Sequence, residues 1–267
     1  MERRMTTFFV KPNNSYPDGE HYQSYTDYWT LIELSGYPIV SPDQIIDHAA
    51  HCYIHTWFTA RFADWTQCRA RHIAWILEWI QPDLENEFPK GCEVWASDPW
   101  YAEQIDAKYV VFGSHPGLKP NTAVQSRGLP YMMALMMYVS PRRSPMIHQF
   151  KELKLTMAPN GWGAERHTYL TNSRSMVHIH QHDGIPTIAP QRFAIAAAYH
   201  LPIISENLAN CDGFQDAILT SDYAHLASFA HQWLTGPKAG MLSSLGHALH
   251  QKLCVEHTFG TEVEAAL

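Results

Sequence analysis

Three arginines in the second half of the sequence lie where an anion could bind. Arg142 and Arg143 follow an apolar stretch, 132–139, that is predicted to be a strand, and Arg192 falls in the first turn of an alanine-rich helix predicted at 190–199. A guanidinium grips a phosphate through paired hydrogen bonds, and a helix N-terminus presents unpaired N–H groups. This pattern predicts a phosphate or diphosphate site, with a solvated pair at a surface turn as the alternative for the adjacent arginines.

A second candidate is the glycine-rich loop 159–166. Gly161 and Gly163 flank Trp162, so the backbone could approach a ligand closely while the indole lies against a base or a sugar. Arg166 adds a cation at the end of this loop. The alternative is a tight turn around a core tryptophan.

A run of histidines follows the predicted strand at 176–180. His178, His180 and His182 share one face if the strand continues, and three imidazoles could ligate zinc. Residues two apart on one strand are roughly 7 Å apart, however, which is too far for all three to reach one ion. We therefore predict no metal site. Polar contacts from His180 and its neighbour Gln181 to a ligand are one interpretation, and plain strand-end histidines are the other.

Three residues could exchange a proton with a hydroxyl group. Asp98 follows a strand predicted at 93–96, His115 follows one predicted at 109–112, and Asp183 lies in the histidine-rich loop. A carboxylate or an imidazole at such a place can act as a general base. For Asp98, capping of the following helix is the alternative.

The elements that would position these residues alternate along the chain. Short apolar runs, which are predicted strands, alternate with amphipathic stretches, which are predicted helices. This alternation is typical of parallel sheets covered by helices. The stretch 114–129 is rich in Gly, Pro, Ser and Asn and reads as a linker, after which the pattern restarts. We therefore predict an α/β fold with two Rossmann-like domains, 1–125 and 126–267, facing a central cleft. Ligands of such sheets bind beyond the carboxyl ends of the strands.

Composition narrows the classes of protein further. The chain has 267 residues, of which 46% are hydrophobic, and its net charge is -7. This composition argues against disorder, and the negative charge does not favour nucleic acid. Arg61, Arg69 and Arg71 could still touch phosphate from one helix, predicted at 58–71, so nucleic acid is a possible partner that we do not favour.

The sequence predicts neither a membrane-spanning helix nor a signal peptide. The longest apolar stretch, 129–139, is shorter than the roughly 20 residues of a membrane-spanning helix. The apolar cluster at 8–10 is too small for a signal peptide, which needs about 7 to 15 such residues. The five cysteines show no CxxC spacing, as expected of free thiols in a reducing compartment. We expect a cytoplasmic protein without a membrane span.

From residue 137 onward the sequence resembles the donor-binding half of GT-B glycosyltransferases. It reads MYVSPRR, APNGWGAER, SRSMVHIHQHDG and PQRFAIAAAYHLPIISE, in that order. The group 1, spore-coat and small viral-type transferases are the most similar in arrangement. Many retaining members bind the donor ribose with two glutamates. In this sequence Thr187 and Ile195 occupy the corresponding positions. Glu206, directly after the next strand, is a candidate replacement.

The resemblance implies that the chain transfers a sugar from a nucleoside diphosphate sugar, UDP-linked first of all, to an acceptor hydroxyl. It implies an acceptor-side first domain, a donor-side second domain, and no metal or other cofactor. The candidate catalytic residues are Asp98, His115 and Asp183. The candidate donor-binding residues are Arg142, Arg143, Gly161, Trp162, Gly163, Arg166, His180, Gln181, Gln191, Arg192 and Glu206.

Three other functions stay open on the sequence. One is a non-catalytic module that binds a nucleotide or a sugar nucleotide, and another is a transferase that acts on modified DNA bases. The third, a metal-dependent hydrolase, would need the histidine run to hold zinc.

Overall fold

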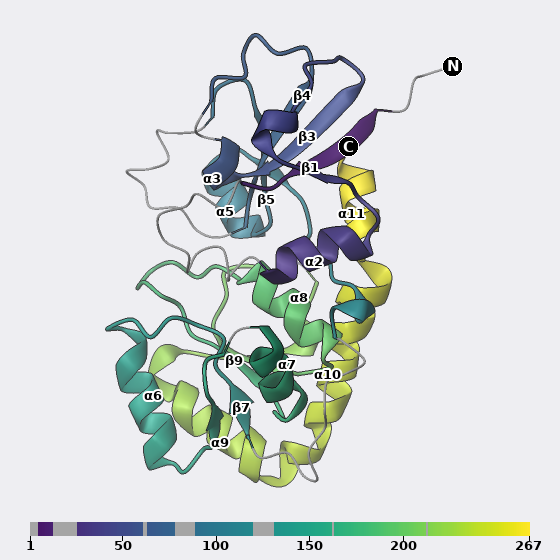
Figure 1. The fold of residues 1–267 in the computed structure, drawn as a ribbon. Coiled ribbons are helices and arrows are strands. Elements are labelled where there is room, and N and C mark those ends of the chain that lie inside the picture. The colour runs from purple at the N-terminus through teal and green to yellow at the C-terminus, as the bar shows by residue number, and fades with distance from the viewer. Residues whose placement is uncertain are drawn as a thin grey trace. The chain divides into compact units, whose positions relative to one another are not determined.

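The structure of the protein is a computed structural model, and the chain folds into two compact units. Residues 1–112 and 259–267 form the first unit, and residues 113–258 form the second. Each unit is built on a parallel sheet with helices around it, so the α/β prediction is confirmed (Figure 1). The residues described are 5–12, 26–60, 63–77, 89–119, 131–161, 163–211 and 213–267.

The first unit contains six parallel strands in the order β2-β1-β3-β4-β5-β6. Its strands are β1 (Thr6–Val10), β2 (Ile39–Val40), β3 (His51–Thr56), β4 (Arg71–Ile76), β5 (Glu93–Ala96) and β6 (Lys108–Tyr109). Its helices are α2 (Thr26–Leu34), α3 (Trp57–Ala60), α5 (Pro99–Gln104) and α11 (Phe259–Ala266), with a 3-10 turn at Pro42–Gln44. Strands β3 and β4 are buried along almost their whole length, including the polar residues His55 and His72.

The core of the first unit is aromatic and includes the last helix of the chain. The fully buried ring of Phe259 lies 5.6 Å from Trp75, 5.5 Å from Phe112 and 5.9 Å from Phe9, measured between ring centroids. Aromatic pairs at such distances add about 0.5–1.5 kcal/mol beyond their buried area. Helix α11 therefore packs beside α2 in the first unit (Figure 1). The sequence prediction had assigned residues 259–267 to the second domain.

The helix predicted at 58–71 is largely wrong. Helix α3 ends at Ala60, and residues 63–70 form turns. Asp64 closes one of these turns by accepting hydrogen bonds from the backbone N–H of Thr66 at 3.0 Å and from its hydroxyl at 2.6 Å. A side chain that bonds its own neighbouring backbone competes with the helix, which explains the difference.

The basic strip expected on that helix does not exist in the described residues. Arg71 lies in β4 and binds the carboxylate of Glu93 through two nitrogens, at 2.6 and 3.1 Å. Arg69 lies in a turn and binds Asp47. Arg61 is outside the described residues. The two arginines that can be placed are thus neutralised by carboxylates instead of facing a phosphate backbone together.

The second unit contains five parallel strands in the order β11-β10-β9-β7-β8. Its strands are β7 (Met133–Ala134), β8 (Met157–Ala158), β9 (Met176–His178), β10 (Ile203–Glu206) and β11 (Ile218–Ser221). Its helices are α6 (Arg143–Glu152), α7 (Gly163–Thr171), α8 (Pro190–Ala198), α9 (Leu226–Thr235) and α10 (Leu242–His250), followed by a π-helical turn at Gln251–Glu256. Short 3-10 turns lie at Pro116–Leu118, Gln215–Ala217, Tyr223–His225 and Pro237–Met241.

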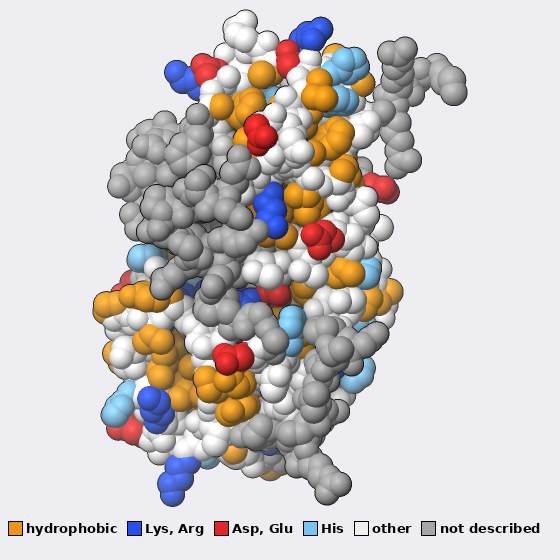
Figure 2. Space-filling view, in the orientation of Figure 1, with side chains coloured by type: hydrophobic (Ala, Val, Ile, Leu, Met, Phe, Trp, Pro, Cys, Tyr) orange, Lys and Arg blue, Asp and Glu red, His pale blue; other side chains and the backbone are white. Residues whose placement is uncertain are grey.

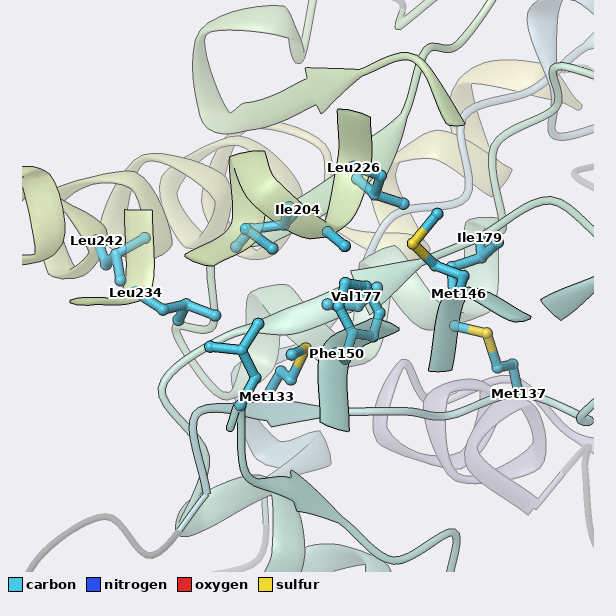
Figure 3. Packing of buried hydrophobic residues seen from close by; sticks show 13 residues of the cluster. Met133, Met137, Met146, Phe150, Val177, Ile179, Ile204, Leu226, Leu234 and Leu242 are labelled. Carbon is cyan, nitrogen blue, oxygen red and sulfur yellow. The ribbon is translucent and has the colours of Figure 1, made fainter. Parts of the chain in front are cut away.

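One face of the second sheet packs against α6 and α9. Figure 3 shows Val177 and Ile204 of the sheet together with Phe150 of α6 and Leu226 and Leu234 of α9. Each such side chain stabilises the fold by about 1.5–3 kcal/mol when fully buried. Successive strand residues point to opposite faces, so the residues next to these two strand positions face the other way. That places His178 on the opposite face, where its ring lies 5.6 Å from the ring of Phe193 in α8.

Helix α10 crosses the end of α8 at a glycine. A Cβ at Gly246 would stand 2.0 Å from the carbonyl oxygen of His200. His200 itself has a φ of +54°, which turns the chain from α8 toward β10. Glycine is therefore required at this contact, and it fixes how closely the C-terminal helices cover α8.

On the face in view, charged side chains of both signs stand among hydrophobic and other polar ones (Figure 2). Two exposed hydrophobic residues, Tyr138 and Val139, come from the stretch 132–139, of which only Met133–Ala134 is a strand. No helix in the described part of the chain has both the length and the apolar character needed to cross a bilayer.

Candidate functional site

Three segments of the second unit meet beyond the carboxyl ends of β9 and β10. The two strands pair in parallel, with Ser205 opposite His178, so the residues after them come to the same edge. The start of α6 reaches this edge as well and brings Arg142, while Glu206 is the last residue of β10. Strand-end logic therefore predicted correctly that this edge gathers polar side chains, although it did not predict how they pair.

Arg142 is the centre of a dense polar network. Its Nη1 and Nη2 donate to the two oxygens of Glu206, both at 2.7 Å, which is the bidentate geometry. Nη1 also donates to the carbonyl of His180 at 3.0 Å, and Nε donates to Asp183. The hydrogen bonds that Arg142 donates to Glu206 hold the pKa of Arg142 above its usual range, so its charge is permanent.

Tyr223 also belongs to this network, because its ring stacks on the guanidinium of Arg142. The Cζ atom of Arg142 lies 4.4 Å from the centroid of the Tyr223 ring, and the Tyr223 hydroxyl donates to the carbonyl of Arg142 at 2.6 Å. A guanidinium stacked on an aromatic face is stabilised by the ring's quadrupole. The sequence interpretation missed Tyr223, although it follows the strand that ends at Ser221 and the strand-end rule could have found it.

Glu206 is buried, in contrast to Asp183. The Glu206 side chain is 8% exposed, and one of its oxygens also accepts from the backbone N–H of His180 at 2.7 Å. Asp183 is 90% exposed. The two carboxylates on Arg142 are thus unequal, because one is a fixed structural partner and the other faces solvent.

Two other predicted arginines are used inside the fold. Arg143 donates from Nε to the carbonyl of Ile179 and from Nη1 to the carbonyl of Tyr138, both at 2.9 Å, and is buried. Arg166 donates from Nε to the carbonyl of Gly161 at 3.1 Å and is buried as well. These hydrogen bonds satisfy carbonyl groups of loops.

The glycine loop is explained partly by packing. A Cβ at Gly161 would lie 2.7 Å from the ring of Tyr169, so the close approach is made by a half-buried side chain of α7. Gly163 is the first residue of α7. Trp162 is outside the described residues.

His178 and His180 have tautomers that their carbonyl partners define. A carbonyl only accepts, so the nitrogen facing it carries the proton. His178 therefore donates from Nε2 to Thr187 at 3.2 Å, and its Nδ1 lone pair faces Nη1 of Arg192, also at 3.2 Å. His180 donates from Nδ1 to the carbonyl of Ile185. Its Nε2 lone pair is buried and has no hydrogen-bond partner among the described residues.

Both histidines are neutral at ordinary pH. Burial lowers the pKa of His178 well below its usual value, and the nearby Arg192 lowers it further. Burial also lowers the pKa of His180. The neutral His178 thus accepts a hydrogen bond from Arg192 and places no second positive charge beside it.

The N-terminus of α8 stands beside these histidines. Pro190 lies in the first turn of α8. The N-cap residue, Ala189, has no side chain that could accept a hydrogen bond from the N–H groups of this turn. Arg192 lies in the same turn, and the buried amide nitrogen of Gln191 has no partner among the described residues. First-turn N–H groups with a cation beside them favour a bound anion.

Asp98 and His115 are helix caps. An oxygen of the buried Asp98 accepts from the backbone N–H of Tyr101 at 2.6 Å, at the start of α5. Nδ1 of His115 accepts from the N–H of Gly117 at 3.0 Å, at the start of the following 3-10 turn. The capping alternative considered for Asp98 is therefore what the structure contains.

In the part of the chain that the structure describes, no group of three or more His, Cys, Asp or Glu side chains is arranged to hold a metal ion. Gln181 and His182 are exposed in the loop after β9.

Comparison with solved structures relates this architecture to known enzymes. AviGT4, a glycosyltransferase involved in avilamycin A biosynthesis, superposes with a TM-score of 0.56 at 12% identity over 98% of this chain and 96% of its own. A DNA-modifying β-glucosyltransferase superposes with a TM-score of 0.52 at 9% identity, over 97% and 98% of the two chains. The chain has the fold of GT-B glycosyltransferases.

A third structure of this fold is longer than the present chain. The TarM G117R mutant of S. aureus, solved with fondaparinux, α-GlcNAc-glycerol and UDP, superposes with a TM-score of 0.54 at 8% identity. The match covers 84% of this chain and 56% of TarM, so the chain spans just over half of TarM's length. By sequence, no protein-family model and no curated protein matches the chain.

Proposed function

We propose that this GT-B-fold protein transfers a sugar from a nucleoside diphosphate sugar to an acceptor hydroxyl. The observation that carries the proposal is the edge of the second sheet, where Arg192 in the first turn of α8 lies 3.2 Å from Nδ1 of His178. The ring of His178 is 5.2 Å from the ring of His180, whose buried Nε2 has no hydrogen-bond partner among the described residues. Cations and N–H groups prearranged around a departing diphosphate stabilise the charge that develops on it.

The donor class follows from chemistry and from the solved relatives. A first turn with N–H groups and a guanidinium suits a diphosphate, and His180 offers an acceptor for a hydroxyl or N–H group of the ligand. TarM was solved with UDP, and the β-glucosyltransferase was solved with and without its substrate uridine diphosphoglucose. A UDP-linked sugar is therefore the donor that we propose, with no metal or other cofactor taking part.

We propose that the first unit holds the acceptor and that Asp98 is its base. Asp98 lies beyond the carboxyl end of β5, where ligands of parallel sheets bind. In the transfer, the acceptor oxygen forms a bond to the anomeric carbon, the bond from that carbon to the diphosphate breaks, and the acceptor proton passes to the carboxylate. His115 then has only its capping role.

The experiment is a turnover assay with a panel of nucleotide sugars, in which release of the nucleoside diphosphate is measured with and without simple alcohols as acceptors. We expect at least one UDP-sugar to be consumed, faster with an acceptor, and at the same rate in the presence of a metal chelator. The Asp98→Asn variant should lose at least 100-fold in turnover, on the order of a general base's contribution. Asparagine caps helices as well as aspartate, so α5 stays intact.

Other outcomes would reject parts of this function. Binding of UDP-sugars without any turnover would make the protein a binding module. Loss of activity with the chelator, restored by a divalent cation, would contradict metal independence. Full activity of Asp98→Asn would remove Asp98 from the chemistry.

A further inference from the structure

Arg142 has little capacity left to bind a diphosphate in the arrangement that the structure contains, because four of its five N–H groups already donate to protein atoms. Four of its hydrogen bonds are already made: two to Glu206, one to the carbonyl of His180 and one to Asp183. The stacked ring of Tyr223 holds the guanidinium plane, and the side chain is only 17% exposed. The guanidinium is therefore fixed in place, and an anion that is to bind at its Nε has to replace Asp183 there.

Asp183 is the partner that can leave. Its side chain is 90% exposed, and among the described residues its carboxylate accepts one side-chain hydrogen bond, from Nε of Arg142. The next residue, Gly184, has a φ of +74°, and a Cβ placed on it would meet no atom within 4 Å. Residues 181–184 are all exposed, so this turn lies at the surface of the unit.

Glu206, by contrast, cannot leave without breaking the strand edge. It is buried, it holds both Nη atoms of Arg142, and it accepts from the N–H of His180. With Glu206 and Asp183 both bound, two carboxylates surround one guanidinium, and these three groups together carry one net negative charge. A diphosphate is repelled by that charge until one carboxylate moves away.

We propose that Asp183 is an internal anion that occupies the phosphate-binding position on Nε of Arg142 and is displaced by the diphosphate of the ligand. This inference rests on the proposed function of the same site. Because Asp183 is tethered, it competes at a high effective concentration, and weak monoanions do not displace it. A diphosphate carries more charge and also contacts Arg192, so it does. Asp183 thereby determines which anions the site accepts and takes no part in the proton transfer.

The experiment is calorimetric titration of inorganic pyrophosphate, and separately of UDP, into the wild-type protein and the Asp183→Asn variant at low ionic strength. Asparagine keeps the size of the side chain and removes the competing charge. We expect Asp183→Asn to bind both probes about fivefold more tightly, the scale of one exposed ion pair. Asp216→Asn is the matched control, because Asp216 is equally an exposed aspartate of the second unit and does not contact Arg142. It should leave both affinities unchanged.

The outcomes separate this inference from the proposed function. Unchanged or weaker pyrophosphate binding by Asp183→Asn would overturn the inference, as would an equal gain in Asp216→Asn. Tighter pyrophosphate binding by Asp183→Asn, with no nucleotide sugar turned over, would support the inference and reject the function. A loss of turnover in Asp183→Asn with unchanged binding of both probes would make Asp183 a catalytic residue and contradict the internal-anion role.

Discussion

Replacing Glu206 by alanine is expected to destabilise the second unit by about 3 kcal/mol, the cost of removing one partner from a largely buried ion pair. The variant leaves the guanidinium of Arg142 without its bidentate acceptor, although the group stays charged on the ring of Tyr223. It also removes the acceptor of the His180 N–H at 2.7 Å. Urea unfolding followed by circular dichroism measures the difference.

Two variants control for this result. Glu206→Gln keeps an oxygen for one of the hydrogen bonds and should fall between the alanine variant and the wild type. Glu256→Ala breaks an exposed pair with Lys252 and should leave the unfolding free energy unchanged. If the Glu206→Ala protein unfolded at the same urea concentration as the wild type, the network around Arg142 would not stabilise this edge of the sheet.

The Arg192→Ala variant is expected to bind UDP about 30-fold more weakly than the wild type, since hydrogen bonds to charged groups contribute about 1.5–3 kcal/mol each. Arg192 lies in the first turn of α8, and its Nη1 is oriented by the neutral Nδ1 of His178 at 3.2 Å. The variant removes a positive charge from the N-terminus of α8. Isothermal titration calorimetry gives the affinity directly.

Arg174→Ala is the matched control for this second effect. Arg174 precedes β9, at the opposite end of the strand from His178, and donates to the carbonyl of Leu234. Its loss should not change UDP affinity. Equal affinities of the Arg192→Ala protein and the wild type would show that the phosphate does not lie at α8.

Much of the site could be predicted because parallel strands bring their carboxyl ends to one edge. This rule places the residues after β9 at such an edge, where the structure has His180, since the rule depends only on the order and direction of strands. The prediction of Glu206 rests on the resemblance to GT-B enzymes. The strand-end rule could not separate Arg142 from Arg143. Successive residues of a helix start point about 100° apart, so one of the two faces the strand ends and the other enters the core. Which one does so is decided by packing.

The prediction failed where a polar side chain bonds its own backbone. The apolar spacing at 58–71 favours a helix, but Asp64 stabilises a turn inside it. The glycines around position 162 suggest room for a ligand or a tight turn, and in the structure the ring of Tyr169 lies close to Gly161. The packing of Phe259 into the first unit could not be predicted either, because nothing local in the sequence tells which sheet a terminal helix covers.

The most direct test of the central claim, that the edge formed by β9, β10 and α8 is a diphosphate site, is a crystal structure of the protein grown with UDP. The account predicts the two phosphates at the first turn of α8, within hydrogen-bond distance of the guanidinium of Arg192. Electron density for UDP at another place on the protein, with no contact to Arg192, would contradict the claim.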